Sequence, residues 1–318
     1  MPEPMTIGVD IGGTKVAAGL VDARGEITHK SRVPIVATGT AEAAFACVKA
    51  SIDEIFAAAP GAREAVAGIG ICAPGPLDPF QGIILNPPNL PCWRNFPLAA
   101  ETARAFGVPA RVDNDANAAG LAEAIWGAGI GYTNVFFAIV GTGIGTGIVF
   151  DRKLYYGRTG CAAEGGHVTI DYQGPVCGCG KHGCIEAFAS GPNIAKRARG
   201  KLVAGAKSKI LALAGSVEAV RTEHVGEAFA AGDPVAEEVL GETAHFLTIW
   251  LGTIVDLLEP DVMVIGGGVA QLMSSFFARM SAGLPEWCVN KRAGEIPLVL
   301  ARYGNDAGIA GAAALLKQ

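Results

Sequence analysis

The sequence lacks the features that mark several large classes of protein. Its 318 residues carry a net charge of −5 and contain no cluster or stripe of Lys and Arg, which argues against nucleic acid and anionic membranes as partners. The first ten residues have neither a basic nor an apolar segment, so we expect no secretory signal. The best candidate for a membrane span, the apolar run 246–255, is too short to cross a bilayer. These absences predict a soluble, cytoplasmic protein.

Two short motifs are missing as well. No G-x-x-x-x-G-K-[ST] sequence occurs, so a bound nucleotide would not be held by a Walker A loop. No C-x-x-C pair occurs, which argues against a thioredoxin-like redox site. A cytoplasmic protein keeps its thiols reduced, so clustered cysteines among the eight present are expected to bind metal rather than to form disulfides.

Glycine, by contrast, is abundant, and its 44 residues indicate many tight turns. Apolar segments at 5–11 and 16–22 flank the turn "GGTK" and predict a β-hairpin, and the pattern returns at 134–151. Strands alternate with helices in both halves, which predicts an α/β protein of two lobes with a cleft between them. The polar stretch 199–233 is weakly patterned and is interpreted as peripheral. Asp306 is expected to cap the final helix.

Three Gly-rich turns each follow an apolar strand. Backbone N–H groups in such turns can approach an anion because no Cβ intervenes, although a single turn of this kind is usually a simple hairpin. Three of them, with Asp10 directly before the first, favour phosphate binding, and Asp10 is a candidate to hold Mg²⁺ through water. The turns contain Gly12, Gly13 and Thr14; Gly141, Thr142 and Gly143; and Gly266, Gly267 and Gly268.

The segment "VDNDANAAG" places Asp113, Asn114 and Asp115 where a strand passes into a helix. Helix capping accounts for Asp and Asn at such a place, above all for Asp113. Asp115, at the end of a strand, is alternatively a candidate general base, with the amide of Asn114 orienting a substrate hydroxyl. These residues alone do not decide between capping and catalysis.

Three cysteines form the pattern Cys-x-Cys-x₄-Cys at Cys177, Cys179 and Cys184, with His167 ten residues upstream. A Cys₃His set is a closed tetrahedral site that suits structural zinc and leaves no position for a catalytic water. His182 is a competing fourth ligand because it is closer in sequence.

Two glutamates accompany this cluster. Glu164 precedes His167 by three residues, and Glu186 follows the last cysteine by two. Each is either a solvated surface charge or, because of its place beside the cluster, part of a functional site.

Together these segments resemble the ROK family, which groups bacterial sugar kinases with related repressors. The motifs occur in the family's order and cover nearly the whole chain except 199–233. The pair "EGGH" and "CGCGKHGCIE" is highly specific, whereas the Gly-rich turns alone are not. The matching motifs are "GVDIGGTK" (8–15), "NDANAA" (114–119), "GTGIGTGI" (141–148), "EGGH" (164–167), "CGCGKHGCIE" (177–186), "IGGGV" (265–269) and "NDAGIAGAA" (305–313).

The resemblance implies an actin-like ATPase fold of the ribonuclease H-like type, with two lobes and an interdomain cleft. It also implies that the final helix returns to the N-terminal lobe. We therefore expect a small lobe of residues 1–117 plus 304–318 and a large lobe, 118–303, that carries the zinc site. Members of the family are commonly dimeric, so a homodimer is expected.

The resemblance also implies roles for individual residues. The Asp of "NDAN", here Asp115, is the catalytic base in such kinases, and the preceding Asn114 contacts the sugar. The Glu and His of "ExGH", here Glu164 and His167, also contact the sugar, and Glu186 does so near its anomeric end.

The same His binds zinc with the three cysteines in the family, which favours His167 over His182 as the fourth ligand. The loop "NPPNLPCW" (86–93) resembles the sugar-side loop of the family's glucokinases and makes Asn89 a candidate contact. The position after Glu164 is Gly165, where bulkier residues are common, so we expect a more flexible loop there.

The resemblance implies ATP as phosphate donor, Mg²⁺ as its cation and a structural Zn²⁺. The candidates for binding the nucleotide and Mg²⁺ are Asp10, Gly12, Gly13, Thr14, Lys15, Gly141, Thr142, Gly143, Gly267 and Gly268.

Our first hypothesis is an ATP-dependent hexose kinase that phosphorylates the 6-hydroxyl of glucose. N-acetylglucosamine and N-acetylmannosamine kinases share the motifs and are alternatives. A sugar-responsive repressor is disfavoured because the nine residues before Asp10 leave no room for a helix-turn-helix. A chaperone-like or filament-forming ATPase is disfavoured by the zinc ligand set and by "NDAN".

Overall fold

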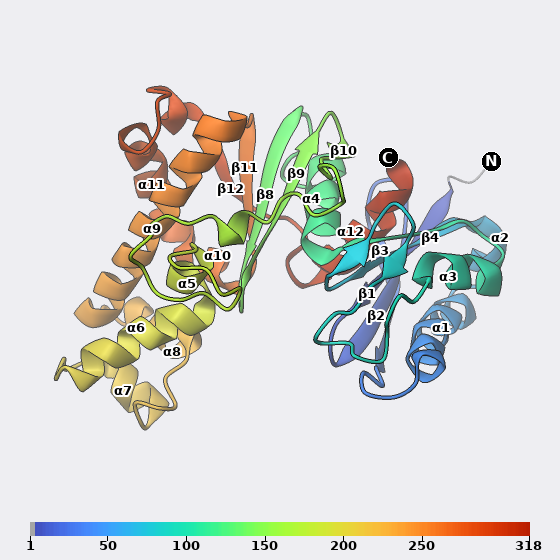
Figure 1. Cartoon of the computed structure of the whole chain (residues 1–318), viewed down its shortest axis with the longest axis horizontal. Helices are drawn as coiled ribbons and strands as arrows, with labels where there is room; N and C mark the ends of the chain where they lie inside the picture. The colour runs from blue at the N-terminus through green and yellow to red at the C-terminus, as the bar shows by residue number, and fades with distance from the viewer. Residues whose placement is uncertain (1–3) are drawn as a thin grey trace. The chain divides into compact units, whose positions relative to one another are not determined.

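The computed structural model describes residues 4–318, which form two compact units (Figure 1). The N-terminal unit comprises the described residues up to Phe137, together with Gly147–Ala163 and Arg302–Gln318. The C-terminal unit comprises Ala138–Thr146 and Glu164–Ala301. The chain therefore leaves the N-terminal unit and returns to it twice, so residues far apart in sequence come together there.

The N-terminal unit is built on a five-stranded sheet with the order β3-β2-β1-β4-β7. β1 and β2 form the predicted hairpin, β3 continues it antiparallel, and β4 and β7 run parallel to β1. The strands are β1 (Met5–Ile11), β2 (Lys15–Val21), β3 (Ile27–Pro34), β4 (Val66–Ala73) and β7 (Ala110–Asn114).

The register of this sheet aligns three polar side chains in a row. Asp10 of β1 pairs with Cys72 of β4, and Cys72 pairs in turn with Asp113 of β7. Neighbouring strands lie about 4.8 Å apart, so the register alone brings these residues together on one face.

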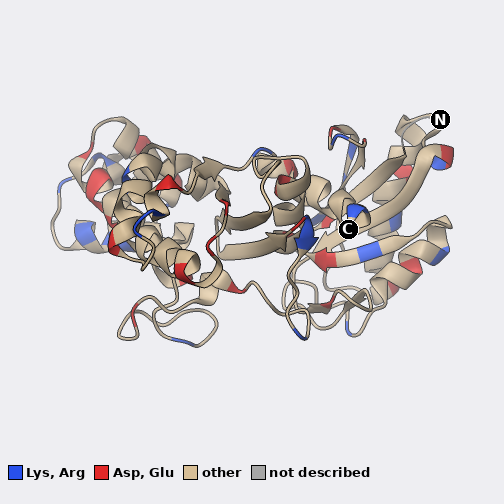
Figure 2. Cartoon of the chain, turned by 90° about the horizontal axis from the view of Figure 1, so that it is seen from above, with Lys and Arg blue, Asp and Glu red and all other residues tan. Residues whose placement is uncertain are grey.

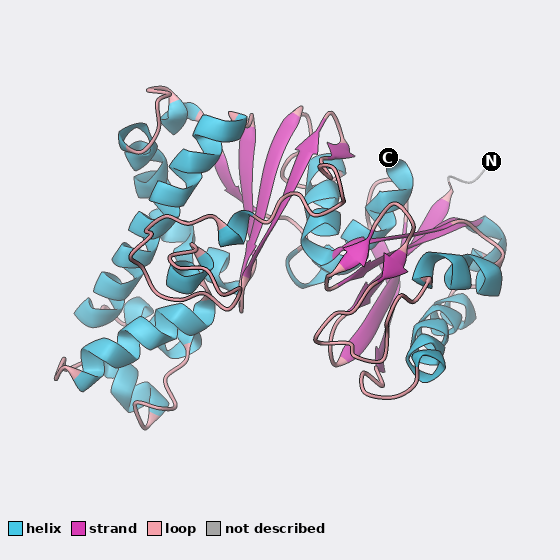
Figure 3. Cartoon of the chain, in the orientation of Figure 1, coloured by secondary structure: helices cyan, strands magenta, loops and turns pink. Residues whose placement is uncertain are grey.

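Helices cover both faces of the sheet (Figures 1 and 3). On one face, the final helix lies so close that a Cβ on Gly8 would stand 1.9 Å from the carbonyl oxygen of Ile309, and one on Gly70 would stand 1.7 Å from that of Ala312. Glycine at these positions is what allows the close packing. The helices of this unit are α1 (Ala41–Ala58), α2 (Ala62–Ala65), α3 (Leu98–Phe106), α4 (Asp115–Ile125) and α12 (Ala307–Ala314).

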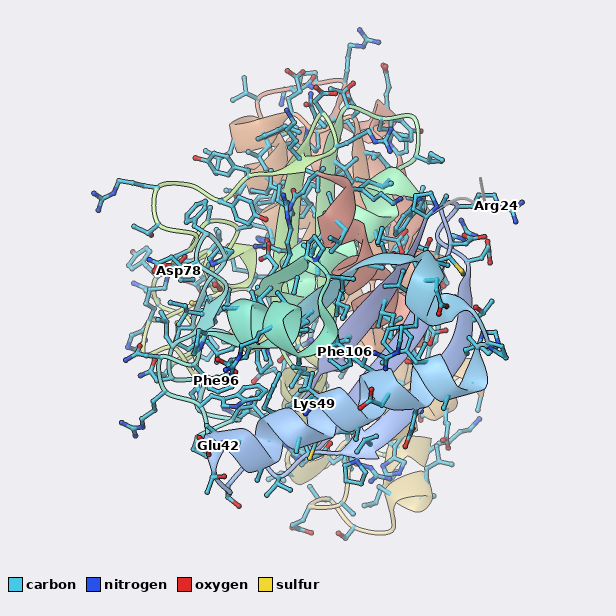
Figure 4. The ribbon with its side chains drawn as sticks, turned by 90° about the vertical axis from the view of Figure 1, so that its right-hand side faces the viewer. Arg24, Glu42, Lys49, Asp78, Phe96 and Phe106 are labelled. Carbon is cyan, nitrogen blue, oxygen red and sulfur yellow. The ribbon has the colours of Figure 1, made fainter. Side chains whose placement is uncertain are left out.

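The opposite face packs against α1, whose outer surface carries Glu42 and Lys49 (Figure 4). Val48 and Ile52 of α1 are fully buried within a core that includes apolar residues of β1 and β4. Phe96 lies against α1, its ring centroid 5.8 Å from that of Phe45. Nearby, a two-stranded hairpin is formed by β5 (Leu77–Asp78) and β6 (Ile83–Ile84).

A second five-stranded sheet has the order β10-β9-β8-β11-β12. β10 runs antiparallel to β9, and β12 runs parallel to β11. β8 and β9 repeat the strand–turn–strand opening of the chain, as the sequence predicts. The strands are β8 (Asn134–Val140), β9 (Ile144–Phe150), β10 (Lys153–Leu154), β11 (Val262–Gly266) and β12 (Leu298–Leu300).

The C-terminal unit is rich in helices, and the longest of them is α9. Asp233 caps α9, and Pro234 occupies its first turn, where the missing N–H of proline costs nothing. No helix among residues 4–318 is long and apolar enough to span a membrane. The α-helices of this unit are α5 (Glu186–Ala189), α6 (Gly191–Val203), α7 (Lys209–Ala214), α8 (Thr222–Ala230), α9 (Pro234–Leu258), α10 (Gly268–Met273) and α11 (Phe277–Gly283).

Short 3₁₀ turns complete the secondary structure of the described residues. They are η1 (Gly165–His167), η2 (Ser274–Phe276), η3 (Leu284–Glu286), η4 (Ala293–Glu295), η5 (Gly304–Asp306) and η6 (Leu315–Lys317). Basic and acidic side chains are interspersed along the chain in both units (Figure 2).

One expectation changes at this level. Asp306 stands at the start of α12, but its carboxylate does not cap the helix and instead pairs with Lys30 at 2.6 Å. The division into lobes at residues 117 and 118 stays a prediction. The compact units separate within β8, and the segment from Arg302 onward lies in the N-terminal unit.

Candidate active site

Asp10 lies near the end of β1, and its carboxylate faces the buried thiol of Cys72. Cys72 Sγ lies 3.5 Å from Asp10 Oδ1 and 3.3 Å from the carbonyl oxygen of Gly308. A Cβ on Gly308 would stand 2.4 Å from the carboxyl carbon of Asp10, so glycine is what lets α12 approach the acid. Burial raises the pKa of Asp10, and the Cys72 thiol and the Lys15 ammonium offset this rise only in part. A carboxylate in this environment suits a cation-binding site.

The first Gly-rich turn follows Asp10 and is closed by a hydrogen bond from Gly12 N to the carbonyl of Lys15, at 2.9 Å. Gly13, Thr14 and Lys15 are exposed. A Cβ on Gly13 would lie 3.5 Å from the Cβ of Asn89. The structure therefore places the predicted sugar-side residue Asn89 beside the predicted phosphate turn.

Asp113 is not a helix cap, contrary to the capping alternative. Its side chain is almost completely buried, because it belongs to β7 and faces inward. Its Oδ2 accepts a hydrogen bond from the Tyr156 hydroxyl at 2.6 Å, and its Oδ1 accepts from Asn114 N at 2.7 Å and Asn117 Nδ2 at 3.1 Å. Asn114 caps α4 instead, and its Oδ1 accepts from Ala116 N at 2.9 Å.

Asp115 is the first residue of α4 and its side chain is exposed. Three carboxylates lie around the thiol of Cys72: burial raises the pKa of Cys72 well above its ordinary value, and the charges of Asp10, Asp115 and Asp113 raise it further. The N-terminal unit thus gathers the candidate magnesium ligand and the candidate base in one place. Sequence reasoning missed Cys72 and Tyr156 because neither lies in a motif.

The second Gly-rich turn joins β8 to β9 and lies between a cavity and the side chain of Glu186. Gly141 and Thr142 line a cavity of about 570 Å³. Two residues further on, Ile144 N donates to Glu186 Oε2 at 2.9 Å. A Cβ on Gly143 would stand 2.6 Å from the same carboxylate oxygen, so this turn holds Glu186 in place only because it carries glycine.

The cavity lies wholly within the C-terminal unit, and its volume is typical of a site for a drug-sized ligand. The start of α10 contributes Gly268. Gly267, with φ of 90°, does not line the cavity but packs against the carbonyl of Val140. The sequence-based description of 199–233 as peripheral misses this site, which the stretch lines with Arg199, Val220, Arg221, Thr222, Glu223 and Gly226.

The predicted metal ligands come together in the C-terminal unit. The ligand atoms of His167, Cys177, Cys179 and Cys184 all lie within 4.8 Å of one another. Cys179 Sγ and Cys184 Sγ are 3.7 Å apart, and Cys177 Sγ is 3.6 Å from His167 Nδ1. Tetrahedral zinc with Zn–S bonds of about 2.3 Å places two sulfurs about 3.8 Å apart. The donor set therefore fits zinc.

His182 does not join this cluster. It is exposed, and its Nδ1 lies 3.2 Å from the carbonyl oxygen of Gly174. Burial raises the pKa of the Cys177 thiol to about 12, whereas a hydrogen bond from the backbone of Lys181 lowers the pKa of Cys179. A bound cation would favour the thiolate form of the cysteines.

Gly165, expected to make its loop flexible, is held on both sides. Its N–H donates to Thr146 Oγ1 at 2.8 Å, and its carbonyl accepts from the buried indole of Trp250 at 3.0 Å. A Cβ on Gly165 would stand 2.7 Å from Thr146 Oγ1. Glu164, directly before it, is exposed. Thr146 and Trp250 escaped sequence reasoning because their contacts join distant parts of the chain.

The sequence matches the ROK family over residues 6–318. The chain belongs to the ROK family. It is 33% identical over 319 residues to a glucokinase of Thermotoga maritima, which covers 100% of this chain and 99% of the relative. It is 36% identical over 312 residues to an N-acetylmannosamine kinase of Escherichia coli O157:H7, which covers 98% and 97%.

Solved structures give the same family. The chain is similar to a ROK family glucokinase from Streptomyces griseus in complex with glucose and AMPPNP, with a TM-score of 0.78, 35% sequence identity and 98% of each chain covered. These findings confirm the predicted family and the actin-like ATPase fold.

Proposed function

We propose that the protein is an ATP-dependent hexose kinase that transfers the γ-phosphate of ATP to the 6-hydroxyl of glucose. The observation that carries this proposal is the turn between β8 and β9. Gly141 and Thr142 line a cavity of about 570 Å³, and Ile144, the first residue after the turn, donates its backbone N–H to the carboxylate of Glu186, a candidate sugar ligand. The similarity to enzymes named glucokinase, one of them solved with glucose and AMPPNP, supports the same function.

Asp115 is the proposed catalytic base. Its exposed carboxylate at the start of α4 would take the proton from the 6-hydroxyl as that oxygen attacks the γ-phosphorus. Asn114 uses Oδ1 to cap α4, so a sugar contact falls to its Nδ2. Asn89, beside Gly13, is proposed as a further contact to the sugar.

Asp10 is proposed to hold Mg²⁺ through water, as magnesium prefers. Mg²⁺ supplies positive charge that offsets the charge on the phosphates. The fit rests on the position of the Asp10 carboxylate, directly before the Gly-rich turn and against Gly308, where no Cβ blocks the approach of α12. Gly13, Thr14 and Lys15 of the adjoining turn would bind phosphate oxygens, and Gly12, whose N–H donates to the carbonyl of Lys15, would close that turn.

The cavity of the C-terminal unit is proposed to hold the rest of the nucleotide. Thr142 and Gly143 would bind phosphate through backbone N–H groups, as would Gly268 at its wall. The N–H of Gly141 donates to the Gly143 carbonyl at 2.9 Å, so Gly141 would shape the turn around the phosphate. Gly267 would act by allowing the close approach of the chain to Val140.

Glu164, His167 and Glu186 are the proposed sugar ligands of the C-terminal unit. His167 would use Nδ1 for zinc, together with Cys177, Cys179 and Cys184, and keep Nε2 for the sugar. Zinc would supply a structural crosslink, since its four ligands leave no open position. Lys181 Nζ donates to the His167 carbonyl at 2.7 Å and supports the same loop.

The sugar is the part of the proposal with a specific competitor. An N-acetylmannosamine kinase is 36% identical to this chain, and N-acetylglucosamine is a further alternative. A pocket for one small group discriminates by only about 1–3 kcal/mol, so a few side chains decide the preference. ADP release should be measured with glucose, mannose, fructose and both N-acetylhexosamines. Glucose should give the highest kcat/KM, and a higher value for an N-acetylhexosamine would overturn the choice of glucose.

Assembly, location and the division into lobes stay predictions. We propose a homodimer in the cytoplasm on the family resemblance and the sequence composition. Light scattering with size-exclusion chromatography tests the first, and a monomeric mass would contradict it. The division into lobes also stays a prediction, with a small lobe of residues 1–117 plus 304–318 and a large lobe of residues 118–303.

A further inference from the structure

The N-terminal unit contains a second cavity, of about 590 Å³, that the proposed kinase mechanism does not use. All of its lining residues belong to this unit. They come from the hairpin between β5 and β6, from β7, from β10 and from the last residues of the chain. Those that carry the inference are Phe80, Arg111, Asp113, Lys153, Tyr156 and Gln318.

Two cations line this cavity without a compensating partner. Arg111 and Lys153 are exposed, and neither forms an ion pair with an acid among the described residues 4–318. Arg111 Nη1 donates to the carbonyl of Leu315 at 3.2 Å, which anchors the guanidinium and leaves most of its five donors available. The one acidic side chain in the lining, that of Asp113, is occupied by Tyr156 and by two other donors.

One wall of the cavity is aromatic. The ring of Phe80 is 61% exposed and lies edge-on to that of Tyr156, with the centroids 5.4 Å apart. Asp78, labelled in Figure 4, orders the turn that carries this ring, because its Oδ1 accepts from Phe80 N at 2.9 Å and from Gln81 N at 3.0 Å. The exposed ring is thus held in a defined position rather than on a loose loop.

We propose that this cavity binds a sugar phosphate, with the phosphate on Arg111 and Lys153 and the carbon skeleton against Phe80. A guanidinium and an ammonium in one cavity match the charge of a phosphate group, and arginine binds phosphate with paired donors. The volume exceeds what an inorganic anion needs, and the aromatic wall suits the apolar face of a sugar ring. This inference goes beyond the proposed kinase activity, which needs no second site.

The cavity connects to the "NDAN" motif through hydrogen bonds. Gln318 Nε2 donates to the Tyr156 hydroxyl at 2.8 Å, and that hydroxyl donates to Asp113 at 2.6 Å. Asp113 in turn accepts from the backbone of Asn114, which caps the helix that begins with Asp115. A tyrosine hydroxyl donates only one hydrogen bond, so a phosphate that accepts it from Tyr156 leaves Asp113 with one donor fewer. The change reaches Asp115 through Asn114, and a sugar phosphate bound in the cavity is therefore expected to lower kcat.

Binding is tested by calorimetric titration of the full chain with glucose 6-phosphate while glucose and AMPPNP are present in excess. The wild type should bind one further molecule, and the double variant Arg111→Gln/Lys153→Gln should bind it at least about tenfold more weakly, because two charge-assisted contacts are lost. Arg104→Gln, a change on α3 away from the cavity, is the matched control. No binding to the wild type, or equal binding to the double variant, overturns the proposal.

Two further measurements test the skeleton contact and the coupling. Phe80→Ala should weaken binding of glucose 6-phosphate more than that of inorganic phosphate, and an equal loss for both would contradict a sugar lying against the ring. At saturating glucose and ATP, glucose 6-phosphate should lower kcat of the wild type but not of the double variant. Inhibition that glucose fully reverses would place the ligand in the catalytic site instead.

Discussion

The two units hold their functional side chains by different means. In the N-terminal unit, Asp10, Cys72 and Asp113 stand on adjacent strands whose backbone register aligns them. In the C-terminal unit, Glu164 and the cysteine cluster stand on a stretch, 164–185, whose regular structure is limited to η1 and two isolated β-bridges. A sheet positions side chains through its ladder of backbone hydrogen bonds, whereas an irregular segment needs side-chain bonds or a metal to do the same. Loss of metal should therefore damage only the second region.

The largest effect is expected on the N-terminal side of this comparison. Asp115→Ala should lower kcat at least about a hundredfold, because loss of a general base typically costs about 10²–10⁴-fold in rate. Its zinc content should stay that of the wild type, since Asp115 lies in the other unit from the cluster. Steady-state kinetics and metal analysis measure both. Asp53→Ala, an exposed acid on α1, is the control, and near-normal turnover of Asp115→Ala would rule out the assignment as base.

Cys179→Ser tests the other side. Cys179 is exposed, so the change leaves the apolar core intact while it removes one of four ligands. Zinc and sugar phosphorylation should be lost together, with activity reduced at least about tenfold, the order of effect that disturbed metal sites show. The same loss is expected for serine at Cys177 or Cys184. Cys161→Ser, exposed but outside the cluster, should retain both. A zinc-free variant with full activity would show that the metal is dispensable.

A smaller effect on catalysis is expected at Gly165, where a side-chain hydrogen bond rather than a metal holds the irregular segment 164–185. Trp250→Phe removes the hydrogen bond to the Gly165 carbonyl, whose net contribution is about 1 kcal/mol. We expect KM for the sugar to rise about fivefold with KM for ATP unchanged. Trp287→Phe, a partly exposed indole, should change neither. A Trp250→Phe enzyme with an unaltered sugar KM would separate this bond from sugar binding.

The smallest effect concerns an acid with a purely structural role. Burial alone would raise the pKa of Asp233, but hydrogen bonds from Lys209 N, Ala236 N and Ser208 outweigh it and lower the pKa below its ordinary 3.8. The ionised form therefore stabilises the fold, fully above pH 3.8, and this contribution is lost as pH falls through the lowered pKa. Asp233→Ala should reduce the free energy of unfolding by about 1 kcal/mol at neutral pH.

The difference in unfolding free energy between wild type and Asp233→Ala should depend on pH, and this dependence is the sharper readout. Chemical denaturation at several pH values should show that the difference disappears only in acid. Glu237 is an exposed acid in the same first turn, and Glu237→Ala should unfold with the free energy of the wild type at every pH. If the difference for Asp233→Ala were the same at every pH, the charge of Asp233 would play no part.

Much of this arrangement could be predicted because the signals are local. Gly-rich turns after apolar strands indicated both hairpins, and the spacing of three cysteines indicated the cluster. The choice of His167 over His182 came from family resemblance, and the structure brings His167 to the three cysteines. The capping role considered for Asp113 was wrong, because a carboxylate at the end of a strand and one at the start of a helix look alike in the sequence until the side chain's hydrogen-bond donor, Tyr156, is known.

The α/β class, the motifs and the types of residue that could do chemistry can be read from the amino-acid sequence, because they depend on composition and short spacings. Which of these residues come into contact depends on the folded chain. Ile144 binds Glu186 across 42 residues, and Trp250 binds Gly165 across 85. Residues of the stretch 199–233 line part of a cavity, although no sequence motif marks this stretch. Such contacts depend on how helices pack onto sheets, and burial of apolar surface drives that packing without leaving a local sequence signal.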